Sequence, residues 1–397
     1  MSQRHLLNVY NRAEPNFVRG YGPWLHTDAG EVYLDCVSGI ATNALGHANP
    51  ALRAALATQA DKLWHVSNMF RIEGQERLAA KLAASTFADR VFFTNSGAEA
   101  VECALKLARR YHYARGRPER TVIYSLSGAF HGRTYATINA AGNPSYLEGF
   151  GERLPGYAVL AAHDRVAMAE ALSRPDTAAI IVEPVQGEGG AREVPRALLR
   201  WLRRECTRSD VLLIYDEVQC GMGRTGRLFA HQWQRGCDPD VMAVAKALGG
   251  GFPVGACLAS ERAAAGMVPG SHGSTFGGNH LAMAVAETAF DVIADEAFLE
   301  TVRATADFLR EGLAEIAGRR PHVVRDLRGK GMLVGLALYP NNREFMACAK
   351  AQKLLVAGGG DNIVRLLPPL NVSRAEAEEI LRRFEATCAA MTMAQAS

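Results

Sequence analysis

The sequence predicts an α/β protein with a large domain around a mainly parallel sheet and a smaller α+β domain made from both chain ends. Between residues 75 and 260, short apolar runs alternate with segments of helical periodicity, which is the pattern of βαβ units. The flanks differ. Residues 14–40 suggest short strands joined by turns, and the last hundred residues suggest long helices with strands between them.

The central elements follow one another in regular order. Helices are expected where apolar residues recur every three to four positions, and strands where short runs are rich in β-branched and aromatic residues. The predicted helices are Gln75–Ser85, Ala98–Tyr113, Arg165–Ser173 and Arg196–Arg208, and the predicted strands are Val91–Phe93, Thr121–Tyr124, Ala178–Val182 and Val211–Tyr215. Helices on both faces of such a sheet leave its ligands at the carboxyl ends of the strands.

The smaller domain is expected to join the two ends of the chain. A long C-terminal helix is followed by strand-like segments at Gly331–Leu338 and Val364–Leu367, and then by a last helix. Ser373 and Glu376 form a capping-box pattern at the start of that helix. We therefore divide the chain into an N-terminal part of the small domain (1–58), a large domain (59–282) and a C-terminal part of the small domain (283–397).

Composition excludes several classes of function. The 397 residues carry a formal net charge of +3 and no run of like charges, so nothing indicates nucleic acid or an anionic membrane as a partner. The eight cysteines are scattered without metal-ligand spacing, as in a reducing compartment, and no metal site is expected. The start, Met-Ser-Gln-Arg-His, shows no apolar core of signal-peptide length. A cytoplasmic location is the expectation.

Lys246 is the first candidate for chemistry. It is the single charged residue between Asp240 and Glu261. Burial in apolar surroundings lowers the pKa of a lysine and favours the neutral amine, which attacks carbonyl groups, including that of pyridoxal phosphate. Taken alone, this segment is explained more readily by a lysine that reaches from a strand end to water.

Asp216 makes the interpretation more specific. It ends the apolar run Val211–Tyr215, so its carboxylate lies where a parallel strand meets a ligand crevice. A fixed carboxylate of this kind keeps the pyridine nitrogen of such a cofactor protonated. An acid that caps a loop is the alternative for Asp216 alone. The pair of a strand-end Asp and an isolated Lys thirty positions later is more specific than either residue.

Two glycine-containing segments remain. Thr94–Ala100 lies between a strand and a helix, where backbone amides can bind a phosphate, although a plain N-cap by Asn95 or Ser96 explains the same residues. Gly221–Gly226 matches the dinucleotide pattern G-x-G-x-x-G, but no clear helix leading to a second strand follows it. We therefore reject nicotinamide binding.

At this point the sequence resembles a known family, the class III, fold-type I aminotransferases, and within it the acetylornithine aminotransferases. The resemblance covers roughly residues 10 to 390. The motifs that carry it are Phe92-Phe-Thr-Asn-Ser-Gly-Ala-Glu-Ala, Gly128-Ala-Phe-His-Gly-Arg-Thr, Val182-Glu-Pro-Val-Gln-Gly-Glu-Gly-Gly, Asp216-Glu-Val-Gln-Cys-Gly-Met-Gly-Arg-Thr-Gly, Ala245-Lys-Ala-Leu-Gly-Gly-Gly-Phe-Pro and Gly273-Ser-Thr-Phe-Gly-Gly-Asn.

The resemblance implies a seven-stranded sheet and pyridoxal 5'-phosphate as cofactor. It implies that Lys246 binds the cofactor covalently and shuttles the substrate proton, and that Asp216 pairs with the pyridine nitrogen. The cofactor would also contact Phe130 on the ring face, Gln219 near the ring hydroxyl, and Gly97, Ala98 and Val218. Thr275 would reach the phosphate of a neighbouring subunit in a homodimer. Many relatives have Thr at the position of Ala98, and proline at the position of His280.

The resemblance also implies how substrates bind. Arg133 and Arg365 would bind carboxylates, and Glu188 would pair with Arg365 when the donor presents no carboxylate there. The remaining substrate contacts would come from Ser274, Tyr10 and Ile40, an aliphatic residue that suits an acylated α-nitrogen.

The implied reaction moves the terminal amine of N-acetylornithine to 2-oxoglutarate. Succinylornithine, ornithine, 4-aminobutyrate or a diamine remain alternative donors, and an aminomutase acting on glutamate semialdehyde remains an alternative reaction. A protein of this fold that binds without catalysis is a further alternative, against which the presence of Lys246, Asp216 and Arg133 argues.

Overall fold

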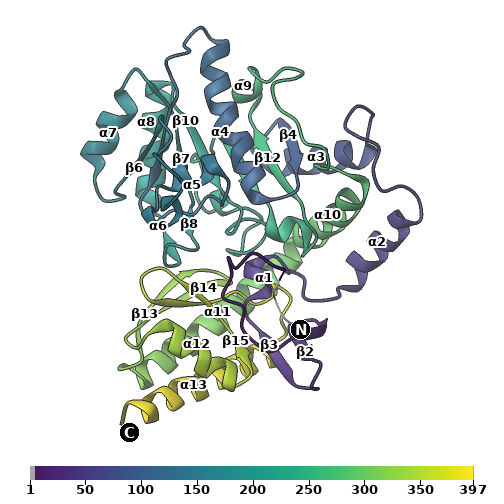
Figure 1. The fold of residues 1–397 in the computed structure, drawn as a ribbon, viewed down its shortest axis with the longest axis vertical. Coiled ribbons are helices and arrows are strands. Elements are labelled where there is room, and N and C mark those ends of the chain that lie inside the picture. Colours follow the sequence, from purple (N-terminus) through teal and green to yellow (C-terminus); the bar gives the residue numbers. More distant parts are fainter. Residues whose placement is uncertain (1–4, 397) are drawn as a thin grey trace.

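The computed structural model describes residues 5–396 and contains a large and a small lobe (Figure 1). Residues 1–4 lie outside the described part, so the structure does not bear on the prediction made for them, which was the absence of a signal-peptide pattern. The large lobe is built on a seven-stranded sheet. Its strands, in spatial order, are β4 (Arg90–Thr94), β12 (Gly255–Ala259), β11 (Val241–Val244), β10 (Leu212–Asp216), β7 (Thr177–Val182), β5 (Val122–Leu126) and β6 (Tyr157–Leu160).

Five strands of this sheet run parallel, from β11 to β6, and β12 joins antiparallel to both β11 and β4. The sheet is therefore mainly parallel and seven-stranded, as predicted. Strands β6, β11 and β12 were not predicted from the sequence. Gly255–Ala259 continues a glycine-rich apolar stretch without alternation, so its direction is set by pairing rather than by a local pattern.

Helices cover both faces of the sheet (Figure 1). Strand β10 shows why, because Leu212 and Ile214 join the cluster under α4 (Gly97–Ala114), while Leu213 and Tyr215 join the larger core on the other face. Alternate residues of a strand point to opposite faces, so a run that is apolar throughout requires cover on both sides. The other helices of the large lobe are α2 (Pro50–Ala60), α3 (Glu73–Ser85), α5 (Tyr135–Ala141), α6 (Pro144–Leu147), α7 (Arg165–Ser173), α8 (Arg196–Ser209), α9 (Glu261–Ala264) and α10 (His280–Ile293).

The small lobe combines both chain ends. Leu34 pairs with Leu354 in parallel, which joins the first strands to the last third of the chain. Its elements are β1 (Phe17–Tyr21), β2 (Trp24–Thr27), β3 (Val32–Asp35), α1 (Ser38–Ala41), α11 (Glu296–Arg319), β13 (Val324–Lys330), β14 (Leu333–Leu338), α12 (Asn342–Ala351), β15 (Leu354–Leu355), β16 (Ala357–Gly359), β17 (Ile363–Leu366) and α13 (Arg374–Ala396).

The predicted elements agree with the structure to within about two residues, and the predicted capping box forms. Ser373 N–H and Oγ donate to the Glu376 carboxylate, and Glu376 N–H donates back to Ser373 Oγ. The helix α10 was not predicted from the sequence, although its polar residues Glu287, Thr288 and Asp291 lie on one face and its buried residues on the other. The proposed domain boundary at residue 282 falls inside this helix.

Short connecting elements complete the fold: the strand pair β8 (Val185–Gln186) and β9 (Arg192–Glu193), and the 3₁₀ turns η1 (Ala230–Trp233) and η2 (Lys246–Gly249). Residues Ser38–Ala41 form a left-handed turn, with φ between +49° and +66°. Such a turn is costly for residues other than glycine. Across residues 5–396, no helix has the length and apolar character needed to cross a membrane.

Candidate active site

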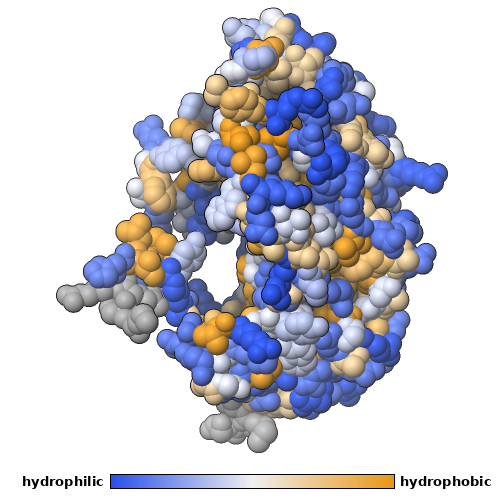
Figure 2. Space-filling model, turned by 90° about the vertical axis from the view of Figure 1, so that its right-hand side faces the viewer, coloured by the Kyte–Doolittle hydropathy of each residue, from blue (hydrophilic) through white to orange (hydrophobic). Residues whose placement is uncertain are grey.

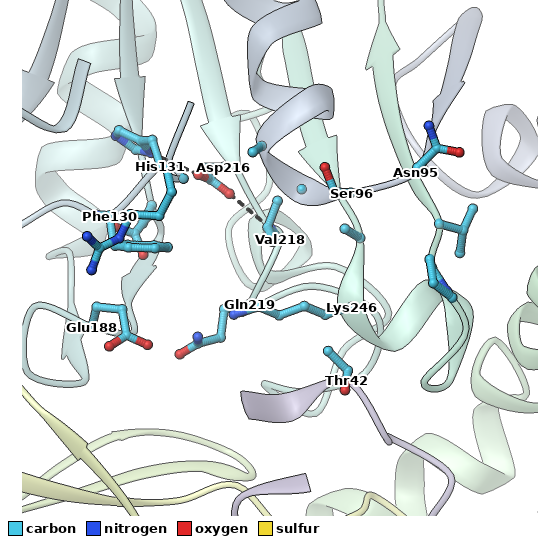
Figure 3. Close-up of a pocket in the computed structure, with 18 of the residues that line it drawn as sticks. Thr42, Asn95, Ser96, Phe130, His131, Glu188, Asp216, Val218, Gln219 and Lys246 are labelled. Carbon is cyan, nitrogen blue, oxygen red and sulfur yellow. Dashed lines mark hydrogen bonds and ion pairs between the residues drawn. The ribbon is translucent and has the colours of Figure 1, made fainter. Parts of the chain in front are cut away.

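A cavity of about 460 Å³ opens where the parallel strands of the large sheet end. Its size is that of a small-molecule site. Figure 3 shows side chains from several segments directed toward it. The lining residues are Thr42, Asn95, Ser96, Gly97, Ala98, Phe130, His131, Gly132, Arg133, Glu183, Glu188, Asp216, Val218, Gln219, Ala245, Lys246, Gly251, Phe252, Pro253 and Val254.

Asp216 lies at the end of β10 and is buried. Its two carboxylate oxygens are held separately, Oδ1 by the Val218 amide at 3.0 Å and Oδ2 by His131 Nδ1 at 2.8 Å (Figure 3). A buried carboxylate held by two partners cannot rotate freely. It presents a fixed negative charge in the cavity, which suits a protonated ring nitrogen.

His131 and Glu183 extend this arrangement behind Asp216. Burial opposes the charged imidazole of His131, but its hydrogen bond with Asp216 and the nearby acids outweigh burial and raise its pKa. Burial raises the pKa of Glu183 to about 7, although the carboxylate accepts hydrogen bonds from the amides of Phe130 and Gly187. The raised pKa favours the charged imidazole of His131, which lies against the buried Asp216 carboxylate.

Lys246 follows β11, the strand beside β10, so its side chain enters the cavity from the same edge of the sheet as Asp216. Its φ of +45° is a conformation that costs roughly 1–3 kcal/mol for a residue with a side chain. Desolvation lowers the pKa of the amine to about 8, against an opposing attraction to Glu188. Roughly a tenth of the amine is therefore neutral, and so nucleophilic, at pH 7.

The start of α4 forms one end of the cavity. Ser96 caps the helix by accepting from the Glu99 amide, while the amides of Gly97 and Ala98 are first-turn donors without intrahelical acceptors. A Cβ at position 97 would lie 2.6 Å from Val218, so only glycine allows this close approach. Free amides at a helix start suit a phosphate, and Ala98 can offer its amide but no hydroxyl.

Phe130 and Arg133 occupy the opposite wall. The Arg133 guanidinium stacks 3.8 Å from the centre of the Tyr146 ring and 5.8 Å from that of Phe130. Within residues 5–396 it forms no ion pair, and it is exposed at the cavity rim. Arg133 is therefore oriented by aromatic stacking, while its donor fork is free for a carboxylate.

Arg365 is held in the opposite way. It lies buried on β17, where Nε and Nη2 both donate to the Gly358 carbonyl. Nη1 donates to Glu188 at 2.6 Å and to Gln219 at 3.2 Å. A Cβ at Gly187 would meet Gln219 at 1.8 Å, so a glycine is required beside this contact. One side of the guanidinium is anchored, and the other is neutralised by an acid that lines the cavity.

The other predicted site residues lie outside this cavity. Ser274 and Thr275 line a neighbouring cavity of about 340 Å³, which shares Asn95 with the first. Ile40 packs in a small apolar cluster with Val185, Ile363 and Leu367, and Tyr10 is exposed beside Arg12. Their roles toward substrate stay predictions.

Several residues of the site were not predicted from the sequence, among them the lining residues Thr42, Asn95, His131 and Glu183, and Tyr146 against Arg133. His131 and Glu183 stand inside motifs that were recognised, next to Phe130 and Val182, and a buried acid next to a strand end was a usable signal. Tyr146 belongs to no motif, so only the folded chain shows its contact with Arg133.

The residues present fit pyridoxal phosphate. The cavity offers an amine of lowered pKa, a fixed acid, an aromatic face and free helix-start amides, which suit in turn the carbonyl, ring nitrogen, ring and phosphate of that molecule. Each feature comes from a different segment, so their convergence is more specific than any single one.

Comparison with known proteins agrees with this chemistry. The family model described as aminotransferase class-III matches residues 9–388. The chain is a class III aminotransferase. It is 60% identical over 389 residues to acetylornithine aminotransferase 2 of Caulobacter vibrioides, covering 98% of this chain and 96% of the relative. The predicted family, fold, reaction class and cofactor are therefore confirmed.

Two solved structures show the same fold. The N-acetylornithine aminotransferase of Stenotrophomonas maltophilia is 36% identical with a TM-score of 0.85, and 97% of this chain and 98% of that one are covered. The ornithine aminotransferase of Toxoplasma gondii, whose active site holds PLP at partial occupancy, is 29% identical with a TM-score of 0.94, covering 100% and 94%. Structural similarity thus extends to enzymes with different amino donors.

Proposed function

We propose that this aminotransferase moves the terminal amino group of N2-acetylornithine to 2-oxoglutarate, giving N-acetylglutamate 5-semialdehyde and glutamate, as a cytoplasmic step of arginine biosynthesis. The observation that carries the proposal is the contrast between a free Arg133 and an Arg365 paired with Glu188. A donor with one carboxylate needs only the free arginine, whereas a dicarboxylate acceptor uses both. The name of the Caulobacter relative supports the acylated donor.

Each residue has a defined task in this proposal. When bound, pyridoxal phosphate supplies an electron sink for exchange of the amino group. Asp216 holds a proton at the pyridine nitrogen, while Lys246 Nζ takes the proton from the donor carbon that bears the amine. Arg133 binds the carboxylate common to donor and acceptor. Glu188 neutralises Arg365 during the donor half-reaction and releases it for the second carboxylate of 2-oxoglutarate.

We also propose a homodimer with shared active sites. Trp64, Met69, Phe70 and Phe276 are 58–84% exposed, and Asn68 joins their two segments by donating to the Ser274 and Gly277 carbonyls. Figure 2, which views the side of α2 and the segment after it, shows hydrophobic residues exposed among hydrophilic ones. Large apolar side chains gathered in this way favour a protein partner. Thr275 lies exposed beside Phe276, where it can reach a neighbouring subunit.

A donor panel tests the substrate assignment. Glutamate formation from 2-oxoglutarate is measured with N-acetylornithine, N-succinylornithine, ornithine, 4-aminobutyrate and a diamine at equal concentrations. We expect the highest kcat/KM with N-acetylornithine. A higher value for ornithine or 4-aminobutyrate would contradict the proposed donor. Turnover of glutamate semialdehyde without 2-oxoglutarate would indicate an aminomutase instead.

A further inference from the structure

Arg224 is a buried cation that the reaction described above does not use. It lies in the glycine-rich segment Gly221–Gly226 that was rejected as a dinucleotide site, and its side chain is 0% exposed. Burial lowers its pKa to about 9, with no acid contributing. Its Nε and Nη2 have no hydrogen-bond partner among the described residues. A cation held in this way costs folding free energy, so its position calls for another explanation.

The contacts that Arg224 does make join the two lobes. Nη1 donates to the Pro368 carbonyl at 2.5 Å and to the Met332 carbonyl at 3.3 Å. The Arg224 carbonyl in turn accepts from the Met332 amide at 2.9 Å. Met332 directly precedes β14 and Pro368 follows β17 closely, and these two strands pair antiparallel. One guanidinium thus closes the end of the strand pair.

That strand pair carries Arg365. In the register of β14 and β17, Arg365 stands opposite Gly335 and is separated from Pro368 by only two residues. The loop that carries Arg224 also lies close to the site residues of the large lobe. It follows β10, which ends at Asp216, and it contains Gln219. Gln219 already contacts Arg365 across the lobe boundary.

The glycines of the segment allow this contact. Gly223 has φ +82°, and a Cβ there would meet Ile293 and Leu370 at 2.9 Å. Gly331 has φ +57°, and a Cβ there would lie 2.6 Å from the backbone of Thr225. Gly223 makes room for two apolar side chains and Gly331 lets its backbone approach that of Thr225, so that Arg224 reaches the strand ends.

We propose that Arg224 is a positioning residue that sets Arg365 at the correct distance from Asp216 and Gln219, and so determines specificity for the dicarboxylate acceptor. This inference rests on the proposed role of Arg365 toward 2-oxoglutarate. Arg224 acts on one half-reaction only, because the donor carboxylate is bound by Arg133 on the opposite wall. Without Arg224, the Met332 and Pro368 carbonyls lose their donor and the end of β17 loosens.

The test separates the two half-reactions in single-turnover experiments on the holoenzyme. Loss of the visible cofactor band with N-acetylornithine alone reports the donor half, and its recovery with 2-oxoglutarate reports the acceptor half. For R224M, which keeps the volume, we expect the acceptor half to slow roughly tenfold or more and the donor half to stay within about twofold. R224K, which keeps one donor, restores most of the acceptor rate.

R303M is the matched control. Arg303 contacts the same segment from α11, through the Gly226 carbonyl at 3.0 Å, and among the described residues its other hydrogen bonds and ion pairs go to Glu296 and Glu300. We expect it to leave both half-reactions within about twofold of the parent enzyme. In hydrogen exchange of the cofactor-free protein, R224M but not R303M speeds exchange in residues 363–370. Both variants are expected to unfold within about 4 °C of the parent.

Three outcomes overturn the inference: equal slowing of both half-reactions in R224M, no slowing of either, or the same behaviour in R303M. R365A distinguishes this failure from failure of the proposed function. If R365A leaves the acceptor half-reaction unchanged, the carboxylate role of Arg365 is wrong. If R365A slows that half and R224M does not, only the role of Arg224 is wrong.

Discussion

The floor and the rim of the active site are built differently. The floor, Lys246 and Asp216, stands on adjacent strands of one sheet, with each carboxylate oxygen of Asp216 held by a separate partner. The rim, Arg133 and the Arg365–Glu188 pair, comes from loops of the large lobe and a strand of the small lobe. The difference indicates that the floor fixes the chemistry for every substrate, whereas the rim selects among substrates.

Replacing Lys246 breaks the floor and has the largest expected effect. K246A removes the group that moves the substrate proton, and proton transfer by a positioned side chain contributes on the order of 10²–10⁴-fold. We expect the rate to fall by at least this factor with every donor and with 2-oxoglutarate. Glutamate formation measures the overall rate, and the disappearance of the visible cofactor band measures the donor half-reaction. K81A, at a half-buried lysine paired with Glu287 and Asp291 outside the cavity, serves as control and keeps activity. Selective loss with one substrate would contradict the division into floor and rim.

Replacing Asp216 tests the floor without removing the attachment point. D216N keeps the shape but removes the fixed charge, and we expect kcat to fall on the order of 10²–10³-fold. The fall should be equal in both half-reactions, because the ring proton is needed in each. Circular dichroism checks that the fold is intact. A variant that slows only one half-reaction would show that Asp216 also acts in substrate choice.

Replacing Arg133 breaks the open side of the rim. R133A removes a charge-assisted fork worth about 1.5–3 kcal/mol, so kcat/KM should fall roughly 10- to 150-fold for both donor and acceptor. The effect should appear mainly in KM, and R133K should recover only part of it. An unchanged KM for either substrate would remove Arg133 from the binding site.

The pH dependence of cofactor attachment at Lys246 is a smaller expected effect, and it also tests the floor. Its pKa is lowered to about 8, so the neutral amine predominates above that pH and decreases about tenfold per unit below it. We expect cofactor attachment to the cofactor-free protein, followed by visible absorbance, to speed up with pH and level off just above 8. A free alkyl amine of ordinary pKa, used as control, continues to gain rate at higher pH. A plateau near pH 10 in the protein would contradict the lowered pKa.

Replacing Glu188 sharpens the comparison within the rim and has the smallest expected effect. E188Q keeps a hydrogen bond to Arg365 but removes the charge that masks it. We expect KM for 2-oxoglutarate to fall a few-fold, which corresponds to a binding free energy of about 1 kcal/mol. KM for N-acetylornithine should rise by a similar factor. Steady-state kinetics with both substrates measures the two shifts. Movement of both KM values in the same direction would show that Glu188 does not discriminate.

The sequence predicted the floor more completely than the rim. Lys246 and Asp216 stand beside uninterrupted apolar strands, so their chemistry can be inferred from local context. The rim depends on contacts between distant segments. Tyr146 against Arg133, and Arg224 against Pro368, bring together residues that no periodicity links. The helix α10 was also missed, although its polar face of Glu287, Thr288 and Asp291 was a usable signal.

The pairing of Leu34 with Leu354 has a consequence for how the enzyme is made. As the ribosome extends the chain, β3 emerges early but meets β15 only when nearly all of the polypeptide has been synthesised. The seven strands of the large sheet all lie between these two points, so that sheet can assemble first. Arg365, on β17 of the small lobe, then takes its place in the last stage of maturation, after Lys246 and Asp216 are already in position.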